Sequence, residues 1–404
     1  MPSLRECHYR HAVYYLYVAM QAGELCNLGR EEVIRGLELF DMEWKNIHAG
    51  QSWAASHCED EDVSALCSTY PNVVEYYLDR QRHPHERIRW LNAALVADRR
   101  LNDRVSEGVH RRDLGSAYFA LGKALQASEC YQQALAVARD TGDAELGNVC
   151  LSDLANVLAN LGDRRAAMEC YQASLMTARS VGNRRGEASA LSNLGVLYAN
   201  VGDLQQAIEH YKEALIIAKE LGDHLQEAKT LGHLGNAHRL RGKNRRARKC
   251  FDEALLIFRR LRDRRGEGNN LADLGNLYQF LDEPRQAIEC HEAALQIARD
   301  IGDRREEGRA LGNLGNAWII LGKYHRASEC YREFLLISRD IGDRQGEGNA
   351  LFNLSVTFHQ LGYHTEAISH AKAALEIFEL TQDANALAVR RTLTQWTEKE
   401  SSQS

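Results

Sequence analysis

Amide and charged side chains recur through the middle and C-terminal parts of this 404-residue chain, mostly three or four residues apart. A side-chain amide both donates to a carbonyl and accepts from an N–H, so a ladder of amides can bind an extended polypeptide backbone. Cations beside them would pair with acidic side chains or with a terminal carboxylate. The members of this row are Asn156, Asn160, Asn193, Asn200, Lys229, His233, Asn236, Arg239, Asn269, Asp273, Asn276, Gln279, Arg309, Asn313, Asn316, Asn349, Asn353 and His359.

Two interpretations of this row remain open. Spacings of three and four place side chains on one stripe of a helix, where they would face a partner together. The competing interpretation is that the amides solvate a groove or hydrogen-bond to the adjoining turn of backbone. The binding interpretation predicts that replacing Asn276 and Asn316 together by alanine abolishes partner binding and leaves the fold intact.

The elements that carry the row follow from a 40-residue repeat. Seven copies start at residues 111, 151, 191, 231, 271, 311 and 351, without insertion or deletion. From residue 122 to residue 362 a glycine recurs every 20 residues, except at Arg262 and Asp282. An apolar residue, glycine and then Asp is typical of a helix that ends in a left-handed residue, with Asp capping the next helix. Each copy therefore predicts two helices, and the stacked pairs predict an all-α solenoid.

The repeat carries a recognisable pattern of residues. One copy shows Leu194, Gly195, Tyr198, Gly202, Ala207, Tyr211, Ala214 and Leu215. This pattern resembles the tetratricopeptide repeat, although the usual unit has about 34 residues. The resemblance implies a right-handed superhelix whose first helices line a concave groove that binds a protein or peptide segment. The 40-residue form is similar to the repeats of the animal adaptor between G-protein α subunits and the spindle. It also resembles those in the C-terminal sensor arms of bacterial signalling NTPases of the STAND and NB-ARC type.

The N-terminal part of the chain adds to the resemblance to the bacterial signalling NTPases. Residues 10–23 and 40–57 resemble the segment that follows the nucleotide-binding and winged-helix modules in those NTPases, which implies an NTPase or effector module as an N-terminal partner. The 40-residue register also continues backwards into a degenerate unit. The predicted organisation is an N-terminal helical cap (1–63), a degenerate first repeat (64–104), seven repeats (105–382), a C-terminal capping helix (383–396) and a disordered tail (397–404).

Cysteines and histidines offer no metal site. Cys130, Cys170, Cys250, Cys290 and Cys330 share one repeat position. Neighbouring helices pack about 8–10 Å apart, whereas a disulfide needs Cα atoms within about 7 Å and zinc needs converging ligands. These residues are therefore interpreted as small buried thiols in a reducing compartment. The N-terminal histidines His8, His11, His48, His57, His83 and His85 match no metal-binding spacing.

Catalytic and targeting signals are absent from the sequence. It has no glycine-rich phosphate loop, no GxGxxG, no HExxH and no GxSxG. We therefore expect a non-enzymatic protein with no cofactor and no metal. No run of about 18 apolar residues is present, and no basic and then apolar leader follows Met1. These observations predict a cytoplasmic protein with no membrane partner.

A basic segment provides an alternative binding surface. Residues 239–265 contain twelve Lys and Arg but three Asp and Glu, in a chain of net charge −6. Such a segment could bind nucleic acid or an acidic partner. Without interleaved aromatic residues for base stacking, nucleic acid is unlikely. Core-facing Ala247 and Phe251 would direct the cations Arg245, Arg246, Arg248 and Lys249 outward as a solvated face. The two missing glycines nearby predict a local change of superhelical pitch.

Overall fold

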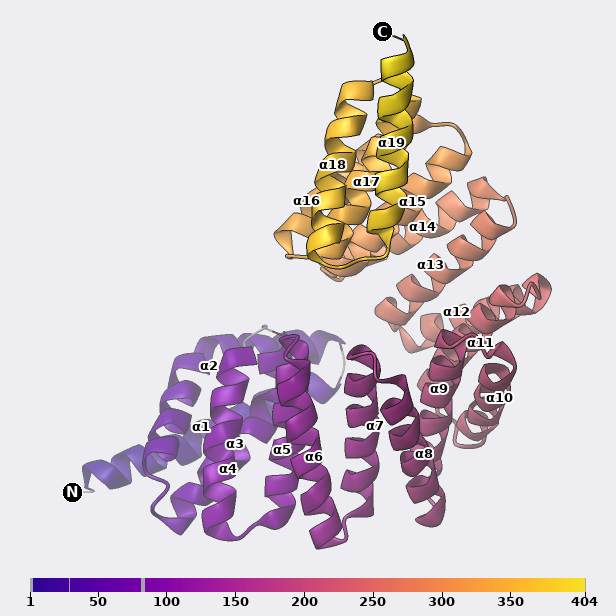
Figure 1. The fold of residues 1–404 in the computed structure, drawn as a ribbon. Coiled ribbons are helices and arrows are strands. Elements are labelled where there is room, and N and C mark those ends of the chain that lie inside the picture. Colours follow the sequence, from indigo (N-terminus) through magenta and orange to yellow (C-terminus); the bar gives the residue numbers. More distant parts are fainter. Residues whose placement is uncertain (1–2, 29, 81–83, 404) are drawn as a thin grey trace. The chain divides into compact units, whose positions relative to one another are not determined.

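The computed structural model describes residues 3–28, 30–80 and 84–403, and nearly all of them are helical (Figure 1). The chain divides into two compact units, Met1–Leu197 and Tyr198–Ser404. The first contains α1 (Leu4–Leu28), α2 (Arg30–Ser56), α3 (Glu61–Arg80), α4 (Pro84–Leu101), α5 (Arg104–Ala120), α6 (Ala124–Thr141), α7 (Ala144–Asn160), α8 (Arg164–Ser180) and most of α9 (Arg184–Asn200). The second contains α10 (Leu204–Glu220), α11 (His224–Leu240), α12 (Asn244–Leu261), α13 (Arg264–Phe280), α14 (Pro284–Asp300), α15 (Arg304–Ile320), α16 (Tyr324–Asp340), α17 (Arg344–Gln360), α18 (His364–Leu380) and α19 (Asn385–Gln403).

Consecutive helices pack against each other as hairpins. In the first unit α1 packs on α2, α3 on α4, α5 on α6 and α7 on α8. In the second, α11 packs on α12, α13 on α14, α15 on α16 and α17 on α18. Within each unit, successive hairpins also contact one another, so that apolar faces too narrow to stabilise a lone hairpin are buried between hairpins. The predicted all-α solenoid of stacked hairpins is confirmed within each unit. Among the described helices, none is long and apolar enough to span a membrane.

Helix ends follow the recurring glycines. Gly302 has a φ of 68°, in the left-handed region that glycine tolerates best. Asp303 then caps α15, because its carboxylate accepts from the backbone N–H of Glu306 at 3.3 Å. Positions of the same register without glycine keep the same turn, with φ of 56° at Arg262, 58° at Asp282 and 54° at Gln382. The missing glycines therefore leave the turn in place and put backbone strain on ordinary residues.

Replacing Arg262 by glycine is expected to stabilise the second unit by about 0.5–1 kcal/mol. Left-handed backbone costs a side-chain-bearing residue about 1–2 kcal/mol, partly offset by the greater freedom of glycine in the unfolded chain. The measurement is the urea midpoint followed by circular dichroism. Arg260→Gly, inside α12, is the control and should lower the midpoint. A lower midpoint for Arg262→Gly as well would contradict the strain argument.

Buried glutamates link several second helices to the first helix that follows. Glu267 at the start of α13 accepts from Arg259 Nε at 2.9 Å and from Arg264 Nη1 at 2.6 Å. Arginines eight and three residues earlier in the chain likewise bind Glu187, Glu307 and Glu347. Burial acts to raise the pKa of Glu267, but hydrogen bonds from Arg259 and Arg264 lower it below the ordinary 4.5. The residues that lengthen the repeat thus form a recurring ionic clamp.

This clamp makes stability depend on pH. Because the folded pKa of Glu267 lies below its unfolded value, its stabilising contribution is complete above about pH 4.5 and is lost as pH falls through the lowered folded value. We expect Glu267→Gln to lower the urea midpoint at pH 7, and the difference from wild type to shrink towards pH 3. A difference that stayed constant across this range would show that the carboxylate charge is not what stabilises the junction.

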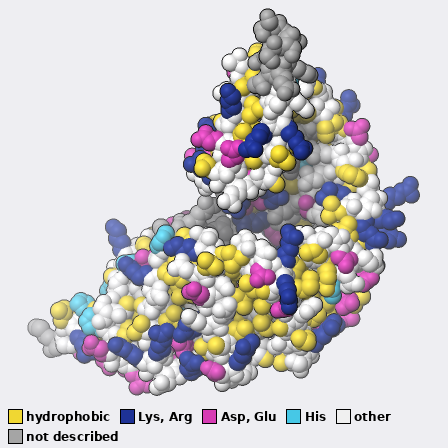
Figure 2. Space-filling view, in the orientation of Figure 1, with side chains coloured by type: hydrophobic (Ala, Val, Ile, Leu, Met, Phe, Trp, Pro, Cys, Tyr) yellow, Lys and Arg dark blue, Asp and Glu magenta, His cyan; other side chains and the backbone are white. Residues whose placement is uncertain are grey.

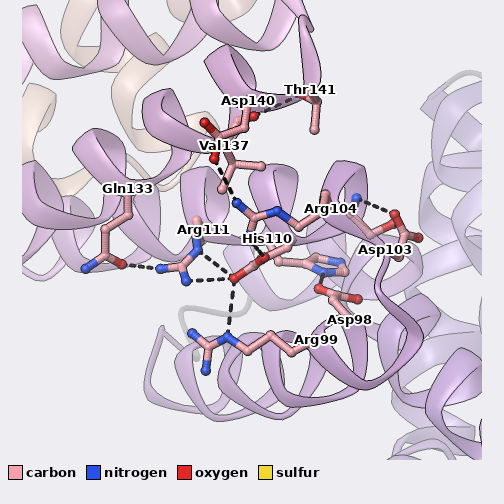
Figure 3. Close-up of polar contacts among 12 residues, drawn as sticks. Asp98, Arg99, Asp103, Arg104, His110, Arg111, Gln133, Val137, Asp140 and Thr141 are labelled. Carbon is pink, nitrogen blue, oxygen red and sulfur yellow. Dashed lines mark hydrogen bonds and ion pairs between the residues drawn. The ribbon is translucent and has the colours of Figure 1, made fainter.

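A buried polar network joins α3, α4 and α5 in the first unit, and Figure 3 shows its central residues Asp98 and His110. His110 Nδ1 lies 2.7 Å from Asp98 Oδ2, and both side chains are fully buried. Ser68 donates to the other Asp98 oxygen at 2.6 Å, and His110 Nε2 lies 3.1 Å from Asn72 Oδ1. The network thus ties the hairpin α3–α4, where the degenerate repeat 64–104 was predicted, to the first regular repeat. The repeat assignment itself stays a prediction.

The C-terminal helix α19 packs against α18. It continues past Trp396, where the sequence analysis placed the start of a disordered tail, and reaches Gln403. No glycine or proline follows Trp396 to end the helix. Residue 404 lies outside the described residues. The ring of Trp396 stacks on His359 with centroids 4.3 Å apart, so α19 covers the last member of the polar row.

Candidate functional site

The predicted row lies on the first helices of the repeats. Its members on α11, α13, α15 and α17 belong to the second unit, and all of them are exposed or half-buried. Each of these first helices contacts the next, in the order α11, α13, α15 and α17, which brings their side chains onto one surface. Asn156, Asn160 and Asn193 are likewise exposed or half-buried but belong to the first unit, and Asn200 is exposed at the last position of α9. The row is therefore divided into two stretches, of which the stretch in the second unit is the longer.

Two of the predicted asparagines already accept a hydrogen bond from a tyrosine of their own repeat. The hydroxyl of Tyr331 donates to Asn316 Oδ1 at 2.7 Å, and that of Tyr171 donates to Asn156 Oδ1 at 2.5 Å. Both tyrosines are buried in the core of their hairpins. The competing, structural interpretation therefore applies to Asn156 and Asn316. For Asn316 the structure therefore predicts a cost to the fold on replacement, unlike the sequence, because its amide satisfies a buried hydroxyl.

Two consecutive repeats lack this tyrosine. Phe251 and His291 stand at its position, and neither has a hydroxyl that could donate to the asparagine fifteen residues earlier. Asn236 instead donates to Asp273 Oδ2 at 2.8 Å, across to the next repeat. Asn276 has no hydrogen-bond partner among the residues that the structure describes. We call Asn236, Asp273 and Asn276 the amide cluster. The sequence already indicates the amide cluster, because two repeats keep the asparagine but lack the tyrosine.

Asp273 is the centre of the amide cluster. Burial in the groove raises the pKa of its carboxyl, while the hydrogen bond from Asn236 and the charges of Arg239 and Arg309 act in the opposite direction. Arg239 also donates weakly to Asn236 Oδ1, at 3.4 Å from both Nε and Nη2. The cluster therefore places one carboxylate and two side-chain amides, with cations beside them, on one half-buried surface.

His233 and Lys229 extend this surface along α11. The His233 ring stacks on Tyr211 with centroids 5.7 Å apart. Burial, and then the charge of Lys229, lower the pKa of His233, so the imidazole is neutral at pH 7. On the other side of the cluster, Gln279 donates to the backbone carbonyl of Asn313 at 2.9 Å and joins α13 to α15.

Two shallow depressions lie on either side of Arg309, which lines both. The first is formed by α13, α14 and α15, with a floor of Ala272, Ala294, Ile297, Ala298, Ile301 and Ala310 and a rim that includes Asn269 and Asn313. The second is formed by α15, α16 and α17, with Phe334, Ile337 and Ile341 in its floor and Asn349 at its rim. Both have an apolar floor and a polar edge, which is the usual construction of a side-chain pocket.

The first unit holds a carboxylate equivalent to Asp273 that the predicted row does not include. Arg112 Nε lies 3.1 Å from Asp153 Oδ2, between α5 and α7. Burial raises the pKa of Asp153, which Arg112 partly counteracts. Asp153 stands at the same repeat position as Asp273, three repeats earlier. Reading the position of Asp273 down the copies would have revealed Asp153, and Asp113 one repeat before it.

The cysteine interpretation holds in part. Cys130 is buried, whereas Cys170, Cys250, Cys290 and Cys330 are half-buried. Burial raises the pKa of Cys130, Cys250, Cys290 and Cys330 to about 11, so these thiols are protonated at pH 7 and pack as small apolar groups. Within the described part of the chain, no group of His, Cys, Asp and Glu has the geometry to hold a metal ion. His83 lies outside the described residues.

The basic segment 239–265 is spread over three helices. Arg239 lies on α11 in the groove, whereas Arg245, Arg246, Arg248 and Lys249 on α12 are exposed, as predicted. Figure 2 shows Lys and Arg side chains gathered at the right edge, in the region of α12 in Figure 1. Local partners offset part of this charge, since Arg248 and Lys249 each lie 3.7 Å from an acidic side chain one turn further on. The segment is thus not one continuous basic face.

The family model described as tetratricopeptide repeat matches six overlapping stretches, residues 106–180, 149–220, 186–260, 226–300, 267–333 and 306–379. No curated protein matches the chain in sequence.

Several solved structures share the fold. Aspartyl phosphate phosphatase F from Bacillus subtilis is 11% identical, covering 83% of this chain and 95% of that chain with a TM-score of 0.59. The apo quorum sensor NprR from B. thuringiensis is 14% identical, covering 93% and 100% with a TM-score of 0.57. A signal transduction ATPase with numerous domains (STAND) with a tetratricopeptide repeat sensor, from Pyrococcus horikoshii, is 15% identical, covering 88% and 56% with a TM-score of 0.56. At these identities the likeness concerns the fold alone.

Proposed function

Because the chain belongs to the tetratricopeptide repeat family, we propose that it is a non-enzymatic scaffold that binds an extended protein or peptide segment on α11, α13, α15 and α17 of the second unit. The observation that carries this proposal is the amide cluster. Two adjacent repeats keep an asparagine but lack the tyrosine that binds it elsewhere; Asn236 pairs with Asp273 of the next repeat instead, and the Asn276 side chain has no hydrogen-bond partner among the described residues. The remaining members of the row, among them Asn269, Asn313, Asn349 and Asn353, extend the surface along the stack.

The chemistry of the cluster suits a peptide backbone. The amide of Asn276 offers two donors and an acceptor, and Asp273 engages Asn236 through Oδ2, which leaves Oδ1 to accept a ligand N–H. Since the groove excludes part of the water, such hydrogen bonds are stronger than at an open surface. The second depression beside Arg309, formed by α15, α16 and α17, would receive a ligand side chain, so that backbone contacts supply affinity and the depression supplies selectivity.

We further propose that the chain is the recognition arm of a bacterial signalling system, with an NTPase or effector module as its partner at the N-terminal end. This is supported by the likeness to the STAND protein, whose repeats are named as a sensor, and to NprR, named as a quorum sensor. The proposal places the protein in the cytoplasm, where thiols such as that of Cys150 stay reduced. One structural neighbour is named as a phosphatase, so the non-enzymatic assignment is tested by incubation with acetyl phosphate, which should not be hydrolysed above the buffer rate.

The test of the binding proposal is affinity capture from lysate with three versions of the full chain, identified by mass spectrometry. The versions are wild type, the groove variant Asp273→Asn with Asn276→Ala, and a matched control on the outer face of α12, Arg245→Ala with Arg246→Ala. A protein captured by wild type and control, and reduced at least about tenfold with the groove variant, is the expected result. Circular dichroism should be the same for all three. Equal capture by the groove variant would refute binding at the amide cluster.

The alternative candidate is binding of an acidic partner or nucleic acid through the basic segment 239–265. The observation that favours it is the exposure of Arg245, Arg246 and Arg260 on α12. The same capture experiment decides it, since a ligand bound there should be lost with the outer-face control and should dissociate between 50 and about 200 mM salt.

A further inference from the structure

Two thiols lie against each other where α2 meets α3 in the first unit. Cys58 stands in the turn after α2, and Cys67 lies on α3. Both belong to one small apolar cluster with Ala54 and Val63, in which Cys58 is 5% exposed and Cys67 is fully buried. The Cys67 thiol donates a hydrogen bond to the sulfur of Cys58. The two sulfur atoms are therefore in direct contact.

The turn that carries Cys58 is attached to both helices. The Cys58 thiol lies 3.0 Å from the backbone carbonyl of Ala54, one turn back along α2. On the other side, the Ser64 hydroxyl near the start of α3 donates to the backbone carbonyl of Cys58 at 2.8 Å. The backbone N–H of Ser64 also donates to the carbonyl of Asp60 at 2.9 Å. These hydrogen bonds hold the Cys58 sulfur beside Cys67, so a bond between the two sulfurs needs only local movement.

The surroundings make Cys58 the more reactive of the two thiols. The hydrogen bond from Cys67 lowers the pKa of Cys58, and although burial opposes this, the charge of Arg100 and a hydrogen bond with Ser64 act in the same direction as Cys67. The same contact between the thiols, followed by burial, raises the pKa of Cys67. Thiolate is the form that attacks an oxidant. Cys58 is therefore suited to react first, with Cys67 as the thiol that resolves the product.

The thiols of the repeats have different surroundings. They stand singly on α6, α8, α12, α14 and α16, as Cys130, Cys170, Cys250, Cys290 and Cys330, and burial raises the pKa of each. Cys150 on α7 is fully buried, and burial raises the pKa of its thiol to about 12. Protonated thiols react slowly with oxidants, so a mild oxidant should distinguish Cys58 and Cys67 from them.

We propose that Cys58 and Cys67 are a redox-active pair that a peroxide converts to a disulfide and a dithiol reductant restores. The disulfide joins the α2–α3 turn covalently to α3 and closes a short loop, which restricts the unfolded chain and stabilises the junction. In the reducing compartment expected for this protein, the pair is reduced at rest. This modification site lies outside the polar row and does not depend on the proposed function.

The reaction needs a two-electron oxidant such as hydrogen peroxide. The Cys58 thiolate attacks one peroxide oxygen, the O–O bond breaks, and the departing hydroxide takes up the proton released by Cys58 and becomes water, which leaves a sulfenic acid on Cys58. The Cys67 sulfur then attacks the Cys58 sulfur. The S–S bond forms, the S–O bond breaks, and the Cys67 proton leaves with the hydroxide as a second water. The two thiols thereby lose two electrons, and one peroxide is reduced to two waters.

The experiment maps the disulfide directly. The reduced full chain is treated with hydrogen peroxide at pH 7, free thiols are blocked with N-ethylmaleimide in urea, and tryptic peptides are identified by mass spectrometry without reduction. No Lys or Arg stands between Lys45 and Arg80, so both cysteines fall in the tryptic peptide of residues 46–80. After peroxide this peptide should be two hydrogens lighter and carry no maleimide, and cleavage after Glu59 and Glu61 should leave its parts joined. Dithiothreitol should restore two reactive thiols.

Variants assign the roles of the two thiols. Cys67→Ser should stop at the sulfenic acid on Cys58, which dimedone labels, because no resolving thiol remains. Cys58→Ser should leave Cys67 reduced. Arg100→Gln should slow the oxidation about threefold at pH 7 and move its pH dependence upward, because a charge that favours the thiolate is lost. Cys150→Ser is the control, since it removes a buried single thiol, and its peptide 46–80 should oxidise as in wild type.

Three results would overturn the proposal. The first is a peptide 46–80 that carries two maleimides after peroxide, as it does before treatment. The second is oxidation of Cys150 to the same extent as Cys58, and the third is a disulfide between two copies of the chain, visible as a dimer on a non-reducing gel. A urea midpoint that is higher for the oxidised than for the reduced wild-type chain is the expected effect on stability. Because the disulfide is mapped in wild type, a variant that fails to fold leaves the test intact.

Discussion

Asp98→Ala should destabilise the first unit by about 3–5 kcal/mol. Asp98 and His110 are fully buried and lie 2.7 Å apart, and Asp98 also accepts from Ser68 at 2.6 Å. Removing one partner of a buried polar pair leaves the other without compensation for its lost hydration, which is among the most costly single changes in a protein core. The substitution also leaves a space between α4 and α5, the helices that carry Asp98 and His110. The measurement is the urea midpoint of the full chain, with attention to whether one or two transitions appear.

Asp140→Ala is the matched control for this prediction. Asp140 also pairs with a basic side chain, Arg104 at 3.1 Å, but it is 68% exposed. Exposed pairs contribute about 0–1 kcal/mol, so its replacement should hardly move the midpoint. If Asp98→Ala were as mild as Asp140→Ala, the buried network would not be what holds α3, α4 and α5 together. A double variant Asp98→Leu with His110→Leu should recover part of the loss, because apolar groups of similar volume need no partner.

Asn316→Ala should destabilise the second unit by about 1–3 kcal/mol, whereas Asn276→Ala should leave its stability unchanged. The two asparagines occupy the same position in consecutive repeats, yet Asn316 accepts from the hydroxyl of Tyr331 at 2.7 Å. Tyr331 is only 2% exposed, so its hydroxyl would lose its acceptor in a site that admits little water. The position equivalent to Tyr331 in the repeat of Asn276 is His291, which carries no hydroxyl, and the Asn276 side chain has no hydrogen-bond partner among the described residues.

The control for Asn316→Ala is the same substitution in a Tyr331→Phe background. Without the hydroxyl, Asn316→Ala should cost almost nothing, because the two residues then no longer interact. Partner binding supplies the second readout, since we expect Asn276→Ala to weaken it and Asn316→Ala to leave it near wild type once the protein is folded. Equal stability losses for Asn276→Ala and Asn316→Ala would contradict the distinction between occupied and available amides.

The sequence by itself determined the architecture of the repeats. A glycine followed by Asp specifies a left-handed helix end and the cap of the next helix, and both depend on residues within a few positions of one another. Gly302 and Asp303 therefore behave as predicted, and the 40-residue period sets the order of the hairpins. The turns at Arg262 and Asp282 show the limit of the same local rule. There, the flanking helices hold the left-handed conformation even without glycine.

The tertiary structure alone decided which members of the polar row are available. An asparagine in one repeat looks like an asparagine in the next, and its role depends on a residue fifteen positions later on the partner helix. Tyr331 occupies Asn316, whereas Phe251 leaves Asn236 to reach Asp273, 37 residues away in the next repeat. Such contacts form only when hairpins stack, because a buried hydroxyl, amide or carboxylate is stabilised by a partner from the neighbouring helix. The row was visible in the sequence, but the site within it arises from packing.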